Sequence, residues 1–211
     1  MTSVGLFFIG AVLFVNGLSL LGRIDARGAA PINALVGLLL VGVAAWVVWP
    51  VRDLDVAANQ DDVIGGAGFL LFAFTYLWVA LNAWTEHSAS GLGWYCCWAA
   101  AVSGFFAVVA FGRLDDAKLG LLWVLWALLF ATFFALLGLQ LEGLQVPAGG
   151  LAVMESIVTT SVPGALLLLG EWSDLATAWV AGATAVTVVV LGLLVLRARA
   201  ASAALARYQS S

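Results

Sequence analysis

Long runs of apolar residues alternate with short polar segments along the whole chain. A helix needs roughly 20 apolar residues to cross about 30 Å of hydrocarbon. Seven runs reach this length, at approximately 1–21, 31–50, 64–84, 91–111, 118–140, 150–170 and 174–196. They are continuous and lack the period-two alternation of a membrane β-barrel, and unpaired backbone is too costly in lipid for other structures. The pattern therefore predicts an all-α polytopic membrane protein with seven spans.

Composition supports a lipid environment and excludes several classes of partner. The chain is 64% hydrophobic and only 9% charged, whereas a soluble domain is about a quarter charged. A net charge of −4 with a single lysine does not favour nucleic acid, which needs clustered basic residues. Cys96 and Cys97 are sequence neighbours and are interpreted as packing residues, and His87 is the only histidine. We therefore expect no metal site, no cofactor and no nucleic-acid partner.

Known chemical motifs also fail to appear. A retinal protein needs a Schiff-base lysine in its last span, and the last run, "LATAWVAGATAVTVVVLGLLVL", has none. The chain contains no P-loop, GxSxG or HExxH pattern of the kind that marks nucleotide or hydrolytic chemistry. We therefore expect a protein that is not an enzyme.

Charge between the runs predicts the orientation. No basic residue precedes the first run, so it is interpreted as a retained helix and not as a secretory signal. Seven spans put the termini on opposite sides, and basic residues favour the cytoplasmic side. An external N-terminus places five arginines inside and three basic residues outside; the inner ones are Arg23, Arg27, Arg197, Arg199 and Arg207. The sequence thus predicts an external N-terminus and a cytoplasmic C-terminus.

One acidic residue, Glu155, lies well inside a predicted span. Charges at such positions are expensive and are usually functional or paired. At 1.5 Å per residue, Glu155 lies about 8 Å from the inner end of its span, and Asn16 has a similar depth in the first span. Thr159 follows one helical turn later on the same face, and Pro163 leaves the Thr159 carbonyl without its helical donor. We expect Glu155 and Asn16 to meet near the cytoplasmic mouth of a cavity; the alternative is a structural hydrogen-bond clasp.

Aromatic side chains follow helical spacing in two spans. The stripes consist of Phe69, Phe72 and Tyr76 in the third span and Trp123, Trp126, Phe130 and Phe133 in the fifth. Such stripes usually mean packing, or anchoring at the membrane interface, but several of these rings lie too deep for an anchoring belt. A pore lined by rings and a few polar edges would suit a flat, neutral, polar solute and would refuse ions, because nothing replaces their hydration shells.

Four blocks of sequence carry a specific resemblance. They are "VGLFFIGAVLFVNGLSLLGRID", "GFLLFAFTYLWVALN", "LLWVLWALLFATFF" and "MESIVTTSVPGALLL", in this order over residues 1–172. The chain resembles the AmiS/UreI family of urea channels and short-chain amide transporters. The resemblance implies passive conduction of urea or small aliphatic amides across the bacterial cytoplasmic membrane.

The resemblance also implies an architecture and a set of pore residues. Residues 1–172 would form a six-helix channel bundle with its own pore, assembled as a homohexamer with a lipid-filled centre. Carried over position by position, the pore-lining residues are Leu6, Ile9, Leu13, Asn16, Phe72, Tyr76, Trp123, Trp126, Phe130 and Glu155. Thr159 joins them from its position one turn beyond Glu155.

Two departures from the family pattern change the expectation. Acid-gated members carry histidines, the natural low-pH sensors, in their outer loops, whereas His87 is assigned to an inner loop, so we expect conduction without acid activation. The chain also adds a seventh transmembrane helix at 173–197 and a cytoplasmic basic tail at 198–211. Two alternatives stay open: a proton-coupled amide transporter that uses Glu155, and a membrane scaffold that transports nothing.

Overall fold

The structure, a computed structural model, describes residues 1–51 and 53–209, and regular secondary structure within them is entirely helical. Seven helical segments are long and apolar enough to cross a membrane, which confirms the predicted all-α polytopic fold. The first five comprise α1 (Thr2–Leu20), α2 (Ala26–Val48), α3 (Ala57–Thr85), α4 (Ser90–Gly112) and α5 (Ala117–Phe133), extended by η1 (Phe134–Gly138). The sixth comprises η2 (Glu142–Leu144), α6 (Gln145–Glu155), η3 (Ser156–Ser161) and α7 (Val162–Leu169), and η4 (Trp172–Asp174) connects it to α8 (Thr177–Gln209).

Several helices begin earlier than the apolar runs indicate. Helix α2 begins at Ala26 instead of residue 31, because the Asp25 side chain accepts a hydrogen bond from the Gly28 amide at 2.7 Å and caps the helix. Helix α3 begins at Ala57 instead of residue 64, and the side chain of Asn59 in its first turn donates to the Asp53 carbonyl at 2.6 Å. Hydropathy alone counted only the apolar part of these helices, whereas polar first turns extend beyond it.

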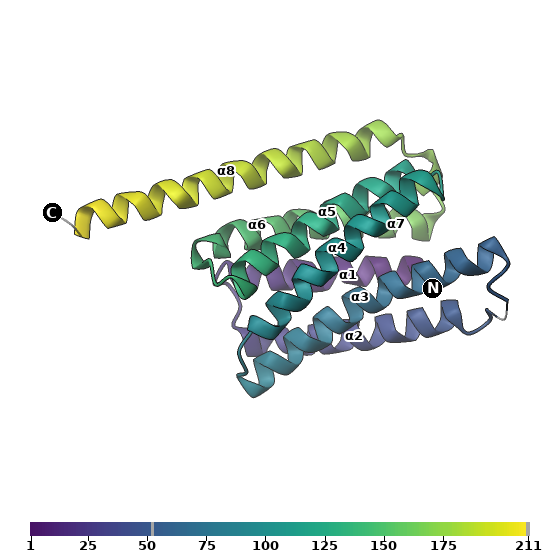
Figure 1. Ribbon diagram of the computed structural model, residues 1–211, viewed down its shortest axis with the longest axis horizontal. Helices are drawn as coiled ribbons and strands as arrows, with labels where there is room; N and C mark the ends of the chain where they lie inside the picture. The colour runs from purple at the N-terminus through teal and green to yellow at the C-terminus, as the bar shows by residue number, and fades with distance from the viewer. Residues whose placement is uncertain (52, 210–211) are drawn as a thin grey trace.

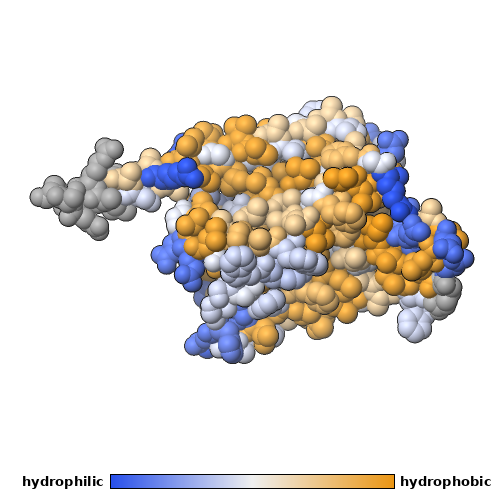
Figure 2. Space-filling model, viewed as in Figure 1, coloured by the Kyte–Doolittle hydropathy of each residue, from blue (hydrophilic) through white to orange (hydrophobic). Residues whose placement is uncertain are grey.

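The first six spans form a closed ring in sequence order. Each packs against the next, and α1 closes the ring by packing along α6, η3 and α7. Figure 1 shows α2 and α3 running side by side along one edge of the bundle, and it places the two ends of the chain at opposite ends of the molecule. The face of the bundle shown in Figure 2 is largely apolar along its side, with hydrophilic residues gathered at both ends. This distribution fits a bundle that spans a bilayer.

Glycines allow the helices of the ring to approach closely, as is common in membranes. A Cβ at Gly17 would lie 2.9 Å from the Gly149 carbonyl oxygen, and one at Gly93 would lie 2.2 Å from the Gly138 amide nitrogen. These are contacts with the backbone of a neighbouring helix. Gly42, in contrast, has open space around the position of a Cβ.

Helix α8 lies outside the ring, against α5 and α6 (Figure 1). Its connection to the ring is held by Lys118, the single lysine of the chain, at the start of α5. The Lys118 Nζ donates to the carbonyls of Trp172 and Leu175 at 2.6 and 3.1 Å and lies 4.9 Å from the centre of the Trp172 ring. The lysine therefore fastens the connector between α7 and α8 to the end of α5.

Candidate functional site

The centre of the ring is filled by a cluster of aromatic side chains from α3 and α5. We call this cluster the aromatic partition; its members are Phe72, Tyr76, Trp123, Trp126 and Phe130, each at most 8% exposed. The Phe72 ring lies 5.1 Å from Trp126 and 5.4 Å from Phe130 between centroids, and Trp123 packs edge-on against Trp126 at 4.7 Å. These are the separations of favourable aromatic pairs, so the two stripes noted in the sequence meet inside one protomer.

A cavity lies on each side of this partition. The proximal cavity, at the end of the bundle where α1 begins, has a volume of about 330 Å³, and the distal cavity, where α1 ends, about 300 Å³. Trp123 and Trp126 line the proximal cavity, Tyr76 and Phe130 line the distal one, and Phe72 lines both. The partition is thus the barrier between two internal spaces that lie along the direction of the helices.

The aliphatic residues of α1 extend past the same barrier. Leu6 and Ile9 line the proximal cavity, and Leu13 lines the distal one. Ile9 is 1% exposed and Leu13 3%. One face of α1 therefore supplies wall residues to both cavities.

The proximal cavity is covered by the connector that Lys118 holds. Trp172 and Asp116 line it, together with Pro163 from α7. Asp116 also caps α5, because its side chain accepts from the Leu119 amide at 2.9 Å. The rim of this cavity is thus built from groups whose positions are set by helix capping and by the lysine.

Thr159 ties the partition to the sixth span. Its hydroxyl donates to the Glu155 carbonyl at 2.7 Å and accepts a hydrogen bond from Trp126 Nε1 at 3.0 Å. Thr159 is fully buried and does not line either cavity. Its hydroxyl is engaged in a clasp between two spans, as in the structural alternative considered for this part of the sequence.

Glu155 is enclosed by the bundle. Its side chain is 0% exposed, and neither carboxyl oxygen has a hydrogen-bond partner among the described residues. The Tyr76 hydroxyl is also buried without a hydrogen-bond partner among the described residues. Glu155 lies outside the walls of both cavities, so the structure places it beside the partition.

The expectation that Asn16 meets Glu155 is wrong. Asn16 instead forms a reciprocal amide pair with Asn33 of α2, with N–H···O distances of 2.9 and 2.7 Å. Asn33 is fully buried and also donates to the Ala29 carbonyl at 2.9 Å. Asn16 was matched with Glu155 by depth alone, but α2 packs beside α1 and offers an amide with both a donor and an acceptor.

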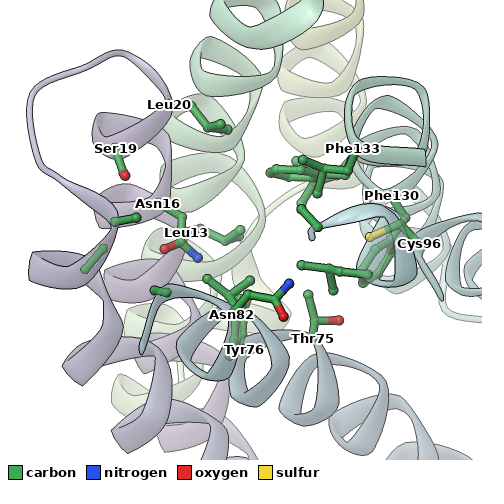
Figure 3. Close-up of a pocket in the computed structure, with 18 of the residues that line it drawn as sticks. Leu13, Asn16, Ser19, Leu20, Thr75, Tyr76, Asn82, Cys96, Phe130 and Phe133 are labelled. Atoms are coloured by element: carbon green, nitrogen blue, oxygen red, sulfur yellow. The ribbon is translucent and has the colours of Figure 1, made fainter. Parts of the chain in front are cut away.

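Sequence reasoning also missed a third asparagine. Asn82 of α3 lines the distal cavity, and its Nδ2 is buried without a hydrogen-bond partner among the described residues. Figure 3 shows the amides of Asn16 and Asn82 on the walls of this cavity, with Tyr76 and Thr75 nearby. Polar residues inside predicted spans were the available signal, because Asn33 and Asn82 fall within the runs 31–50 and 64–84.

Two short π-helical segments border the site. Segment η1 (Phe134–Gly138) follows α5 directly beyond the partition, and η3 (Ser156–Ser161) begins immediately after Glu155. Segments of this kind are rare and occur frequently at functional sites. Pro163 lies in the first turn of α7, directly after η3. The π-helical turns of η3 therefore come just before the proline, which has no backbone amide to donate.

Known proteins resemble this chain over most of its length. The profile of the AmiS/UreI family transporters matches residues 1–171. A Mycolicibacterium smegmatis protein named as a transporter of amidate substrates is 41% identical over 172 residues, which cover 82% of this chain and 78% of that protein. The Rhodococcus erythropolis transporter protein AmiS2 is 36% identical over 193 residues, covering 92% of this chain and 91% of its own length.

A solved structure is similar as well. The urea channel of Helicobacter pylori in its closed state superposes with a TM-score of 0.71 and 27% identity, covering 82% of this chain and 100% of that one. The similarity to that channel and the family match to residue 171 both agree with the six-span ring that precedes α8.

Proposed function

This chain belongs to the AmiS/UreI family of transporters, and from that premise we propose that it is a passive channel for urea or short aliphatic amides. It is a multi-pass membrane transport protein and not an enzyme. The observation that best supports a passive channel is a pair of cavities inside a single protomer, with volumes of about 330 and 300 Å³, separated by one layer of aromatic side chains.

The walls of the cavities favour a neutral solute. Asp116, at the rim of the proximal cavity, is the only charged residue among the described residues that line either space. The partition offers ring faces on which a planar amide can stack, and no group there replaces the hydration shell of an ion. In the proposed mechanism, an amide passes between the cavities when the rings of the partition shift.

The first expected result is a flux that follows the concentration gradient. Liposomes containing the purified protein should take up urea or acetamide faster than protein-free liposomes, and uptake should stop when inner and outer concentrations are equal. The rate should be similar at an external pH of about 5 and about 7, because the single histidine, His87, lies between α3 and α4 on the side assigned to the cytoplasm. Stopped-flow light scattering measures both properties. Uphill accumulation driven by a proton gradient would contradict the passive channel.

The carboxyl group of Glu155 supports a second candidate, a proton-coupled amide transporter. Ionisable groups inside membrane spans are expensive and commonly mark proton or substrate pathways. Glu155 is fully buried with both oxygens unpartnered, so it is available to a proton or to an amide NH₂ that reaches it when the partition opens. The same uptake assay with and without a pH gradient separates the two candidates.

We expect the Glu155→Gln variant to conduct less than the parent protein. The change replaces one of two acceptor oxygens with a donor at similar shape, so the amide NH₂ groups of the solute lose an acceptor. A lost hydrogen bond of about 0.5–1.5 kcal/mol corresponds to about a twofold to tenfold fall in acetamide flux at limiting concentration. Glu142→Gln at the exposed start of the sixth span is the control and should conduct normally. Unchanged flux through the Glu155 variant would remove this carboxyl group from the pathway.

We further propose how the protomers assemble and how each is oriented in the membrane. Residues 1–172 form the conducting bundle, 173–197 an added transmembrane helix and 198–211 a basic tail in the cytoplasm. The proposed pore lining consists of Leu6, Ile9, Leu13, Asn16, Phe72, Tyr76, Trp123, Trp126 and Phe130, with Asn82 added to it. Glu155 and Thr159, which line neither cavity, act on this path from beside the partition. The protomers assemble as a homohexamer with a lipid-filled centre in the bacterial cytoplasmic membrane, with the N-terminus outside. The proximal cavity then faces outward and the distal cavity faces the cytoplasm.

A further inference from the structure

The distal cavity has a polar corner within otherwise apolar walls. Asn16 and Asn82 bring amide groups to it (Figure 3), whereas Leu92, Leu129 and Phe133 are among its apolar lining residues. No Asp, Glu, Lys, Arg or His belongs to the described lining. A ligand held here is therefore a neutral molecule with one polar end.

The hydrogen-bonding capacity of the asparagines indicates which polar end fits. An asparagine amide has two N–H donors and a carbonyl with two lone pairs. Asn33 uses both donors, to Asn16 and to the Ala29 carbonyl, and is therefore fixed. Asn16 uses one donor toward Asn33, so its second N–H is left for the cavity that Asn16 lines.

Asn82 contributes donors without any competing partner. Its Nδ2 is buried and makes no hydrogen bond to the described residues, and such an unsatisfied group costs about 1–3 kcal/mol. The Tyr76 hydroxyl is unsatisfied in the same way. A solute carbonyl oxygen that reaches the Asn82 amide would satisfy a donor that the described residues leave open.

We propose that Asn82 and Asn16 form an amide-binding station in the distal cavity, where their N–H groups donate to the carbonyl oxygen of a neutral solute amide. Asn33 is the positioning residue, because its reciprocal pair with Asn16 fixes the direction of the Asn16 N–H. The apolar walls receive the alkyl end of the solute. This inference rests on the proposed conduction of amides and assigns a resting point beside the aromatic partition, on its distal side.

The test measures how acetamide flux saturates. Radiolabelled acetamide equilibrium exchange is followed in proteoliposomes over a range of concentrations, with protein-free liposomes subtracted. Asn82→Leu, which keeps the volume and removes the donors, should raise the half-saturating concentration about threefold to tenfold, the loss expected for one hydrogen bond. Asn82→Thr, which replaces the amide with a hydroxyl that can still donate one hydrogen bond, should give a smaller rise. This variant provides the measurement if the leucine variant does not fold.

Two further variants complete the design. Thr85→Val is the control. Thr85 is exposed about one turn further along α3, and its hydroxyl donates to the Leu81 carbonyl of the same helix. This variant should leave the saturation curve unchanged. Asn33→Leu should raise the half-saturating concentration in the parent protein but should add nothing in an Asn16→Leu background, because Asn33 acts through Asn16. A full additional effect in that background would overturn the positioning role.

The outcomes separate this proposal from the function on which it rests. If the parent protein does not exchange acetamide above protein-free liposomes, the conduction of amides and the station both fail. If the parent protein exchanges acetamide and both Asn82 variants share its saturation curve, the station alone is overturned.

Discussion

Replacing Phe72 with alanine is expected to join the two cavities and to raise acetamide flux about tenfold. Phe72 is the residue that lines both spaces, and its ring packs against four neighbouring rings of the partition. Aromatic pairs contribute about 0.5–1.5 kcal/mol each beyond their buried area. Each 1.36 kcal/mol removed from a barrier raises a rate tenfold. If the ring must shift during the proposed passage, its removal is therefore expected to raise the flux about tenfold.

The measurement is stopped-flow uptake of acetamide, normalised to the amount of assembled protein, because deleting a buried ring also lowers stability by about 3–5 kcal/mol. Phe74→Ala is the matched control, since Phe74 lies on the same helix and is 50% exposed at the outer surface. The Phe72 variant should also admit larger solutes such as glycerol. Flux at or below the parent level in correctly assembled protein would show that Phe72 is not the barrier between the cavities.

The second large effect concerns stability, and it comes from replacing Gly93 with alanine. A Cβ at this position would lie 2.2 Å from the amide nitrogen and 2.5 Å from the Cα of Gly138, and 2.6 Å from the Leu137 carbonyl carbon. All three are backbone atoms, so relief requires α4 and η1 to separate. Overpacking typically costs about 1–3 kcal/mol of folding stability when side chains can adjust. Because backbone atoms cannot move aside in this way, we expect the stability of the Gly93 variant to fall by this amount or more.

The comparison is Gly104→Ala on the same helix, where no atom lies within 4 Å of the added Cβ. That change should be neutral or stabilising by up to about 1 kcal/mol, because alanine favours a helix over glycine. The midpoint of thermal unfolding in detergent, followed by circular dichroism, measures both. Equal midpoints for the two variants would mean that the close approach of Gly93 to Gly138 is absent from the folded protein.

The sequence predicted the architecture well because membrane spans have a strong compositional signal. The seven apolar runs correspond to seven membrane-length helical segments, and the runs at 91–111 and 118–140 agree with the structure within two residues at each end. The starts of α2 and α3 were missed because they depend on capping by Asp25 and on polar first turns, which a hydropathy pattern does not weigh. The π-helical turns of η1 and η3 were also missed, since they have no distinctive composition.

The candidate site was partly accessible from the sequence. Helical spacing placed Phe72 and Tyr76 on one face and Trp126 and Phe130 on another, and the structure brings these two faces together. Depth within a span, however, does not reveal which helices are neighbours. For this reason Asn16 was assigned to Glu155 although it pairs with Asn33, and the open donors of Asn82 became visible only with the cavity around them.

The aromatic partition has a consequence for the energy balance of the cell. Moving one elementary charge across a membrane involves about 2.3 kcal/mol per 100 mV of membrane potential, so a wet, ion-permeable pore would dissipate that potential. Phe72, Trp126 and Phe130, each at most 4% exposed, lie between the two cavities as a layer without charged groups. Under the proposed passive function, an uncharged amide that crosses this layer does no electrical work, so its supply would depend on how fast the cytoplasm consumes it and not on respiration.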